Sequence, residues 1–492
     1  MAPDTSDIGA RKTRAAKIRA ELGHPVVDAD GHAIEHGPVY FDYLKQVAGP
    51  KITARYRAFL DDGGWFGLTP EVRRDRRIAR PSSWTLPTAN ALDRATAMLP
   101  RLFRARMDDF GLDFSVVYST MALSITRFED EELRRATCRA LNVMFADLYR
   151  DQADRMTPVA AIPSHTPEEA IAELDFAIGE LGLKATMINS NVRRPIAAVA
   201  GKGPEVARYA TWMDCLTMES PYDYDPLWQR CMDLKVAVTS HAPSVGWGSR
   251  VVSYQYVHNH VGSFAASGEA FAKGLVLSGV TQRFPELNFA FLEGGVAWAC
   301  ELYAGLVGHC GKRNSKAIHR YDPRNLDVEQ LADLFAEYGA GMVDGRPDPT
   351  DPDFTKSPVG WNAMGDDLIA HELDHLGLEK AEDLRPLFEP NFYFGCEADD
   401  PLVALGFDRR MNPFGSRLKA MFSSDIGHWD VPDMAEELED AYELREKDLL
   451  NPAEFRDFTF VHPAMLHAGM NPDFFKGTVV EQAAAALLKD QA

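Results

Sequence analysis

Short, continuous apolar runs recur along the chain and alternate with segments of helical periodicity. Each run ends in polar or turn-forming residues, which is typical of strands buried on both faces of a parallel sheet. The runs that we predict to be strands are Pro25–Asp30, Phe114–Tyr118, Pro158–Ile162, Ala185–Ile188, Val236–Thr239, Asn288–Leu292, Asn391–Phe394 and Lys419–Phe422. Helical patterns lie between them, for example over Pro167–Leu181 and Pro226–Leu234. Eight such β–α units predict an α/β fold, a closed (β/α)₈ TIM barrel rather than an open sheet.

The spacing of the predicted strands is uneven. We expect the barrel over residues 23–470, with large helical insertions after strands 1 and 6 at about 40–105 and 300–388. Residues 1–22 read as an N-terminal arm or a short helix, and residues 471–492 as a C-terminal tail. Because barrel loops lie at the ends of the strands, the insertions are expected to form lids or oligomer contacts. A homo-oligomer is expected, or a hetero-oligomer with a homologous subunit.

The composition narrows the class of protein. The 73 acidic residues against 52 Lys and Arg give a formal net charge of -21, which argues against nucleic acid or an anionic membrane as a partner. The six cysteines are widely separated and form no Cys-x-x-Cys pair, as expected for reduced thiols. The chain shows neither a secretory signal nor an apolar stretch of transmembrane length, so a soluble, cytoplasmic protein is expected.

Ligand-type side chains follow several of the predicted strands. Asp30 and His32 share one face at the end of the first strand, His241 follows the fifth, Glu293 the sixth and Asp425 the eighth. Because the C-terminal strand ends of a barrel converge on one site, these residues are expected to lie close together. A mixture of carboxylate and imidazole suits Zn, Mn or Fe better than Mg or Ca. Any one of these residues alone is more often a turn or cap residue. Because ligand-type residues follow several strands of the same predicted barrel, a metal site is favoured.

This ordered set resembles the amidohydrolase superfamily. The shared pattern is Asp-x-His after strand one, His after strand five, Glu-Gly-Gly after strand six and Ser-Asp-x-x-His-Trp after strand eight. It is most similar to the amidohydrolase-related branch that includes aminocarboxymuconate semialdehyde decarboxylase and related metal-dependent hydrolases. The resemblance extends from about Val26 to His467, with gaps at the insertions.

The resemblance implies the roles of the site residues. Asp30, His32, His241 and Asp425 would be the metal ligands, and Asp425 would also accept a proton from water bound to one or two divalent cations. Two positions depart from the usual pattern: Asp30 replaces a His, and Glu293 stands where the decarboxylases of the group carry a His. The additional carboxylates would permit a second, bridged cation, with Glu35 or Glu293 between the ions.

His428 is a further candidate for catalysis, through stabilisation of an oxyanion, or for binding the metal; a supporting role as a hydrogen-bond partner is the alternative. Arg193, Arg250 and Trp247 are candidates for binding a small-molecule substrate, although surface ion pairing and core packing are the more common roles of such residues.

The expected activity is hydrolysis of a small organic acid, amide, ester or lactone by metal-activated water. Non-oxidative decarboxylation is the main alternative. Two further alternatives are an enzyme that uses oxygen at a dinuclear metal site and a non-catalytic barrel subunit of a hetero-oligomer.

One other motif suggests metal chemistry. His371 and His375 form a His-Glu-x-x-His pattern, which in zinc proteases places two imidazoles on one helix face. The motif lies within the second insertion, on a helix expected over about 366–376. A solvated helix face or an oligomer contact is the favoured interpretation.

Overall fold

The computed structural model describes residues 8–10, 12–64, 67–82, 89–207, 209–243, 248–321, 325–346, 372–428 and 430–491. The chain folds as two compact units, one formed by Met1–Tyr303 with Leu387–Ala492 and the other by Ala304–Pro386. The first unit holds every strand discussed below. None of the helices in the described ranges has the length and apolarity needed to cross a membrane.

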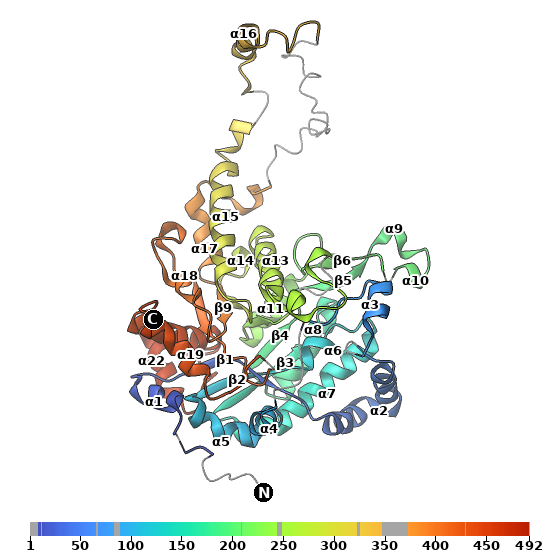
Figure 1. Cartoon of the computed structure of the whole chain (residues 1–492), viewed down its shortest axis with the longest axis vertical. Helices are drawn as coiled ribbons and strands as arrows, with labels where there is room; N and C mark the ends of the chain where they lie inside the picture. The colour runs from blue at the N-terminus through green and yellow to red at the C-terminus, as the bar shows by residue number, and fades with distance from the viewer. Residues whose placement is uncertain are drawn as a thin grey trace. The chain divides into compact units, whose positions relative to one another are not determined.

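The larger unit is built on eight parallel strands in the order β1-β2-β3-β4-β7-β8-β9-β10 (Figure 1). Their bounds are β1 Val27–Ala33, β2 Phe114–Ser119, β3 Met156–Ile162, β4 Ala185–Ile188, β7 Val238–Ser240, β8 Phe289–Phe291, β9 Phe392–Cys396 and β10 Lys419–Phe422. Each of the eight predicted strands overlaps one of them. Nearly all of their residues are buried, because helices cover the outside and side chains fill the inside.

The ring closes between its first strand and the loop after its last strand. The His32 amide donates to the Ile426 carbonyl at 2.7 Å, and the Asp425 amide donates to the Asp30 carbonyl at 3.0 Å. The Asp28 carboxylate accepts the Ser424 amide at 2.9 Å and the Ser115 hydroxyl at 2.7 Å. The predicted (β/α)₈ barrel is confirmed, and the bonds that close it also position the residues after β10 against β1.

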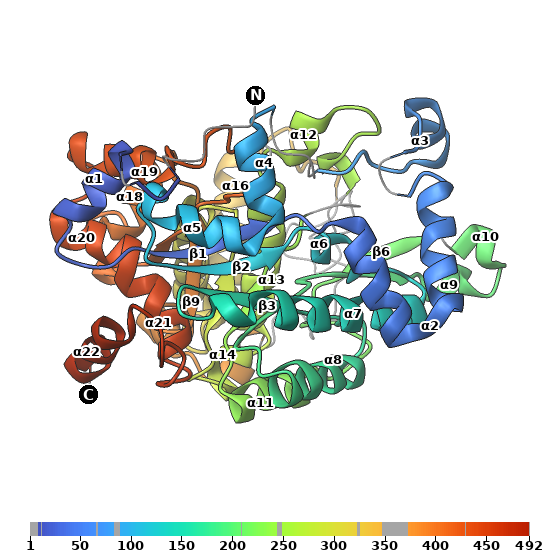
Figure 2. The ribbon, with the colours of Figure 1, turned by 90° about the horizontal axis from the view of Figure 1, so that it is seen from below.

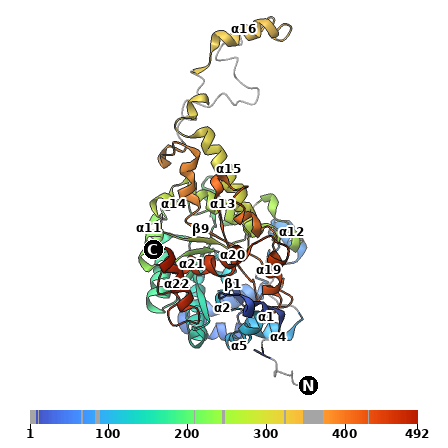
Figure 3. The ribbon, with the colours of Figure 1, turned by 90° about the vertical axis from the view of Figure 1, so that its left-hand side faces the viewer.

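Helices surround the barrel, as the view from below and the side view show (Figures 2 and 3). The helices of the larger unit are α1 Arg14–Glu21, α2 Gly37–Asp61, α3 Pro70–Arg76, α4 Ala91–Met98, α5 Pro100–Phe110, α6 Ala122–Ile125, α7 Glu131–Tyr149, α8 Pro167–Leu174, α9 Ala197–Ala200, α10 Pro204–Ala207, α11 Asp225–Leu234, α12 Tyr256–His260, α13 Ser263–Leu277, α14 Val280–Arg283, α18 Val403–Phe407, α19 Glu437–Glu446, α20 Pro452–Arg456, α21 His462–Ala468 and α22 Glu481–Gln491. Helix α15 Ala297–Arg313 begins in this unit, and α17 Arg385–Phe388 ends in it.

Described segments near both ends of the chain pack within the larger unit. In α1, Ala15, Ala16 and Ile18 are buried, and Arg14 forms ion pairs with Glu439 and Glu446. Near the other end, Phe474 and Phe475 are buried, and the Phe474 ring stacks on His467.

Two features differ from the sequence-based predictions. Strands β5 Val192–Pro195 and β6 Thr211–Asp214 form a separate antiparallel sheet that the sequence pattern did not indicate. The helix predicted over Pro167–Leu181 is α8 followed by a π-helix over Asp175–Glu180.

The smaller unit carries α16 Val328–Tyr338 and several short 3₁₀ helices. The helix expected over 366–376 lies largely outside the described residues, as does His371. The described end of that segment is a 3₁₀ helix over Asp374–Leu376, which includes His375. The role of the His-Glu-x-x-His motif therefore stays a prediction.

Candidate metal centre

Four of the predicted ligands converge at the C-terminal end of the barrel. Asp30 and His32 belong to β1, His241 follows β7, and Asp425 follows β10. The Nε2 atoms of His32 and His241 lie 3.0 Å apart. Asp30 Oδ1 lies 3.4 Å from His32 Nε2, and Asp30 Oδ2 lies 3.3 Å from His241 Nε2. Asp425 Oδ1 lies 3.2 Å from His32 Nε2.

The atoms of Asp30, His32 and His241 lie close enough together to hold one cation, and Asp425 belongs to an adjoining group with His32, Glu293 and His428. Bonds of about 2.0–2.2 Å from Zn to nitrogen or oxygen place neighbouring ligand atoms roughly 3–3.5 Å apart, and the four distances above fall in that interval. All four side chains are at most 5% exposed. Both oxygens of Asp30 and of Asp425 are buried and accept no hydrogen bond of good geometry in the described structure, although imidazole nitrogens lie 2.6–3.4 Å from three of the four. Such buried acceptors require compensation, which a cation supplies. The residues therefore fit a divalent metal ion.

Glu293 and His428 adjoin the four ligands. Glu293 Oε2 lies 3.4 Å from His241 Nε2, and His428 Nδ1 lies 2.6 Å from Asp425 Oδ1. The His428 ring also stacks on His32, with centroids 3.6 Å apart. His32, Glu293, Asp425 and His428 offer atoms that all lie within 4.8 Å of one another. The structure thus brings together the six predicted ligand and catalytic residues; their roles stay proposals.

The electrostatics of the cluster separate two kinds of carboxyl group. Burial opposes ionisation of Asp30 and Asp425, but His241 and His32 beside Asp30, and His428 and His32 beside Asp425, lower both pKa values. In return, despite burial, Asp30 and Asp425 raise the pKa of His32 to about 10. Burial and the neighbouring Asp425 carboxylate raise the pKa of Glu293 well above its usual range. The cluster holds three carboxyl groups beside three imidazoles, and Glu293 is the one whose pKa is raised rather than lowered.

Backbone strain marks two of these positions. Glu293 and Asp425 have φ values of 56° and 51°, in the left-handed region that residues other than glycine seldom adopt. Strain of this kind concentrates at functional sites, where the surrounding structure holds it in place. At Asp425 the backbone is held by the hydrogen bond that its amide donates to the Asp30 carbonyl.

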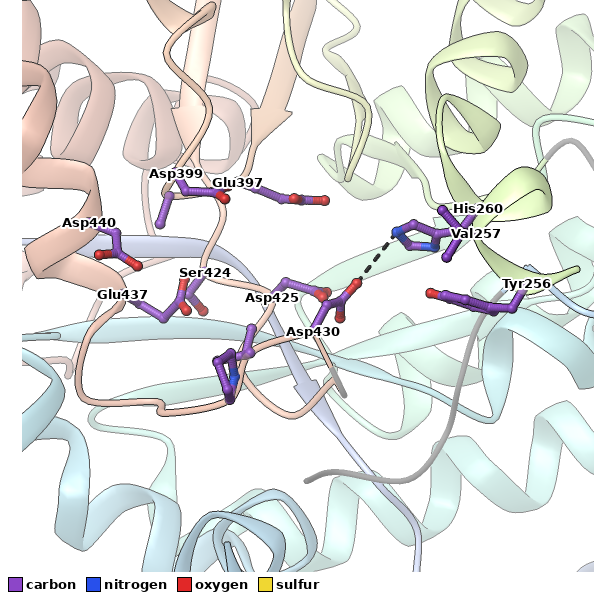
Figure 4. A pocket seen from close by; sticks show the side chains of 13 residues that line it. Tyr256, Val257, His260, Glu397, Asp399, Ser424, Asp425, Asp430, Glu437 and Asp440 are labelled. Carbon is purple, nitrogen blue, oxygen red and sulfur yellow. Dashed lines mark ion pairs between the residues drawn. The ribbon is translucent and has the colours of Figure 1, made fainter. Parts of the chain in front are cut away.

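Beside the cluster lies a pocket of about 420 Å³ that Asp425 helps to line (Figure 4). Six of its lining residues are acidic, and none of the described lining residues is Lys or Arg. The lining residues are Tyr256, Val257, His260, Glu397, Ala398, Asp399, Ser424, Asp425, Asp430, Val431, Pro432, Glu437 and Asp440. Burial and the neighbouring Asp425 raise the pKa of Glu397 to about 8 and that of Asp430 to about 7.

Sequence reasoning missed two groups of this pocket. Glu397 directly follows β9, so the strand-end rule that found the other ligands could have found it. His260 ends the short helix α12, between β7 and β8, where no sequence pattern marks it.

The predicted substrate-binding residues are not gathered at the cluster. Arg193 lies exposed on β5, and Arg250 lies exposed in a 3₁₀ helix over Gly248–Arg250. Within the described ranges, neither guanidinium forms an ion pair with the metal ligands. Trp247 lies outside the described residues. Glu35, one of the two bridging candidates, accepts hydrogen bonds from the Ser119 hydroxyl and the Met121 amide instead of facing the cluster.

A parallel eight-stranded barrel with buried carboxylates and imidazoles at its C-terminal end defines this protein as a (β/α)₈-barrel enzyme with a candidate metal centre. The family model for amidohydrolases matches residues 89–340, just over half of the chain. The protein belongs to the amidohydrolase family.

One solved structure shares the fold at low sequence identity, and two decarboxylase structures are more distantly similar. An amidohydrolase from Mycobacterium avium subsp. paratuberculosis K-10 is 16% identical, with a TM-score of 0.51 over 90% of this chain and 99% of that one. A dihydroxybenzoic acid decarboxylase from Polaromonas sp., crystallised with manganese and 2-nitroresorcinol, is 15% identical, with a TM-score of 0.45 over 90% and 97%. The 5-carboxyvanillate decarboxylase of Sphingomonas paucimobilis is 12% identical, with a TM-score of 0.43 over 90% and 98%.

Proposed function

We propose that this protein is a metal-dependent hydrolase that cleaves an amide, ester or lactone bond of a small substrate. The observation that carries the proposal is the group of Asp30, His32 and His241, whose atoms lie close enough together to hold one cation, with Asp425 at 3.2 Å from His32. These four residues would hold Zn, Mn or Fe. Such a cation supplies Lewis acidity, which polarises a carbonyl and makes a water molecule acidic near neutral pH.

Asp425 is the residue best placed to move the proton in this reaction. Its carboxylate belongs both to the ligand cluster and to the lining of the adjacent pocket. His428 Nδ1 lies 2.6 Å from Asp425 Oδ1 and holds that oxygen in place. The Asp425 amide donates a hydrogen bond to the Asp30 carbonyl, which fixes the backbone. Asp425 would accept the proton of the attacking water and deliver it to the leaving group.

The charge of the pocket favours hydrolysis over decarboxylation. A decarboxylase must bind a substrate carboxylate, whereas the described lining of this pocket presents carboxylates and no Lys or Arg. An uncharged or positively charged acyl substrate suits such a lining better.

Decarboxylation is the second candidate, because several solved structures with this fold are decarboxylases. Glu293 is the observation that favours it within this chain. Its carboxyl group is buried beside His241, where it could give a proton to the substrate carbon as carbon dioxide leaves and the bonding electron pair stays behind. Both reactions act on a small-molecule substrate. The expected homo-oligomer, or hetero-oligomer with a homologous subunit, stays a prediction.

Activity measurements on the Mn-, Zn- and Fe-loaded protein distinguish the two reactions. We expect hydrolysis from a panel of neutral and cationic amides, esters and lactones, and no carbon dioxide from hydroxybenzoates. Asp425→Asn should abolish turnover while most of the metal stays bound, whereas Asp399→Asn, in the same pocket, should keep the centre intact. Carbon dioxide release without hydrolysis would establish the second candidate, and full turnover by Asp425→Asn would remove its role as the base.

A further inference from the structure

A second group of ligand-type side chains adjoins the first cluster. His260 comes from α12, Glu293 follows β8, and Asp430 lies in the loop beyond β10. Each offers one ligand atom, and these atoms all lie within 4.8 Å of one another. We propose that His260, Glu293 and Asp430 bind a second divalent cation, and that Glu293 lies between the two metal positions.

His260 is oriented as a metal-binding imidazole usually is. Its Nδ1 atom lies 2.8 Å from the Ser82 carbonyl oxygen, which can only accept a hydrogen bond. Nδ1 therefore carries the proton, and Nε2 is directed toward Asp430 Oδ2 at 3.4 Å. Figure 4 shows this ring and the Asp430 carboxylate facing each other across the pocket. A backbone carbonyl that fixes the ring through its other nitrogen is the common supporting contact of metal-bound histidine.

Glu293 provides an independent indication of a ligand. Its side chain is 3% exposed, and its Oε2 atom is buried without a hydrogen-bond partner in the described structure. The same oxygen lies 3.4 Å from His241 Nε2, within the first cluster. A buried carboxyl oxygen without a partner is the kind of atom that a bound ion would satisfy, and Glu293 adjoins two groups of ligand atoms rather than one.

The donor set indicates which cation the second position would take. Two carboxylates and one imidazole suit Mn, Fe or Zn, the same ions as the first cluster. A cation here would offset the charge of Glu293 and Asp430, and Asp399, Glu437 and Asp440 would remain as acidic lining of the pocket. The alternative without a metal is a simple ion pair between protonated His260 and Asp430.

Metal stoichiometry and electron paramagnetic resonance of the full-length protein, loaded with Mn²⁺ alone, test the proposal. The wild type should bind two Mn²⁺ per chain and give the signal of a spin-coupled pair. His260→Ala and Asp430→Asn should each bind one and lose the coupled signal. His258→Ala, on the same helix, is the matched control and should bind two.

The outcomes of this experiment are separate from those for the proposed hydrolase. One Mn²⁺ per chain in the wild type at saturation, or two in both His260→Ala and Asp430→Asn, would overturn the second site. Either result leaves hydrolysis at the first cluster untouched. Thermal unfolding of each variant identifies any loss of metal that comes from misfolding, and in that case His260→Gln replaces His260→Ala in the comparison.

Discussion

Replacing Gly427 with alanine should disturb the metal centre through the backbone, without removing any ligand. A Cβ atom on Gly427 would lie 2.5 Å from the His32 carbonyl oxygen and 3.2 Å from His32 Cβ. The residue also has a φ of +107°, which side chains rarely tolerate. Because His32 is held in β1, the loop that carries Asp425 and His428 would have to move away from it.

The expected cost follows from these two effects. Overpacking in a filled interior costs about 1–3 kcal/mol, and a side chain in an unfavourable backbone region costs about 1–3 kcal/mol. Together they should lower the free energy of unfolding by roughly 2–6 kcal/mol. Gly182→Ala is the matched control: its φ is +74° and nothing lies within 4 Å, so only a backbone cost of about 1–2 kcal/mol is expected.

Urea unfolding and Mn²⁺ titration measure both consequences. Gly427→Ala should lose more stability than Gly182→Ala and should bind Mn²⁺ more weakly, because the Asp425 carboxylate leaves its place beside His32. Equal losses of stability in the two variants, together with wild-type Mn²⁺ affinity in Gly427→Ala, would refute the close contact between this loop and β1.

Two further predictions concern buried charge and pH. Glu169→Leu should lower the free energy of unfolding by about 3–5 kcal/mol, because it leaves Arg134, its buried partner at 2.7 Å, without a counter-charge. Glu131→Gln, which breaks an exposed pair with Arg135, should cost less than about 1 kcal/mol; equal losses in urea unfolding would contradict this contrast. Burial lowers the pKa of His467 to about 3. Between about pH 3 and 6.5 the His467 imidazole is therefore neutral in the folded protein, whereas in the unfolded chain it binds a proton below about pH 6.5. Stability should therefore fall as pH drops from 6.5 toward 3, by up to about 1.4 kcal/mol per unit for this group. His467→Phe should flatten that slope in unfolding measured at several pH values, and an unchanged slope would show that His467 does not cause it.

The barrel could be predicted from the sequence because its strands are buried on both faces and appear as continuous apolar runs. β4 and β10 have the predicted bounds, whereas β7 begins two residues later than the apolar run that predicted it. The sheet of β5 and β6 was missed because its strands are partly exposed and contain charged residues such as Arg193 and Arg194. Their pairing depends on tertiary contacts rather than on a local apolar pattern.

Some residues of the candidate site could also be predicted from the sequence, and others could not. His241, Glu293 and Asp425 follow their strands within three residues, so barrel geometry alone predicts that they converge. His260 and Asp430 reach the pocket from long loops, and the direction of a loop is not encoded in a short pattern. Arg193 and Arg250 were predicted from their charge and from their positions after strands four and five, and neither property says which way an exposed side chain points.

Anomalous diffraction from crystals of the Mn-loaded protein tests the central claim most directly. We predict a peak within bonding distance of His32 Nε2 and His241 Nε2, with Asp30 and Asp425 oxygens completing the ligand set. The peak should be absent in a His32→Ala variant that remains folded. A protein that carries Mn²⁺ elsewhere, with no anomalous density among these four residues, would contradict the assignment of the metal centre.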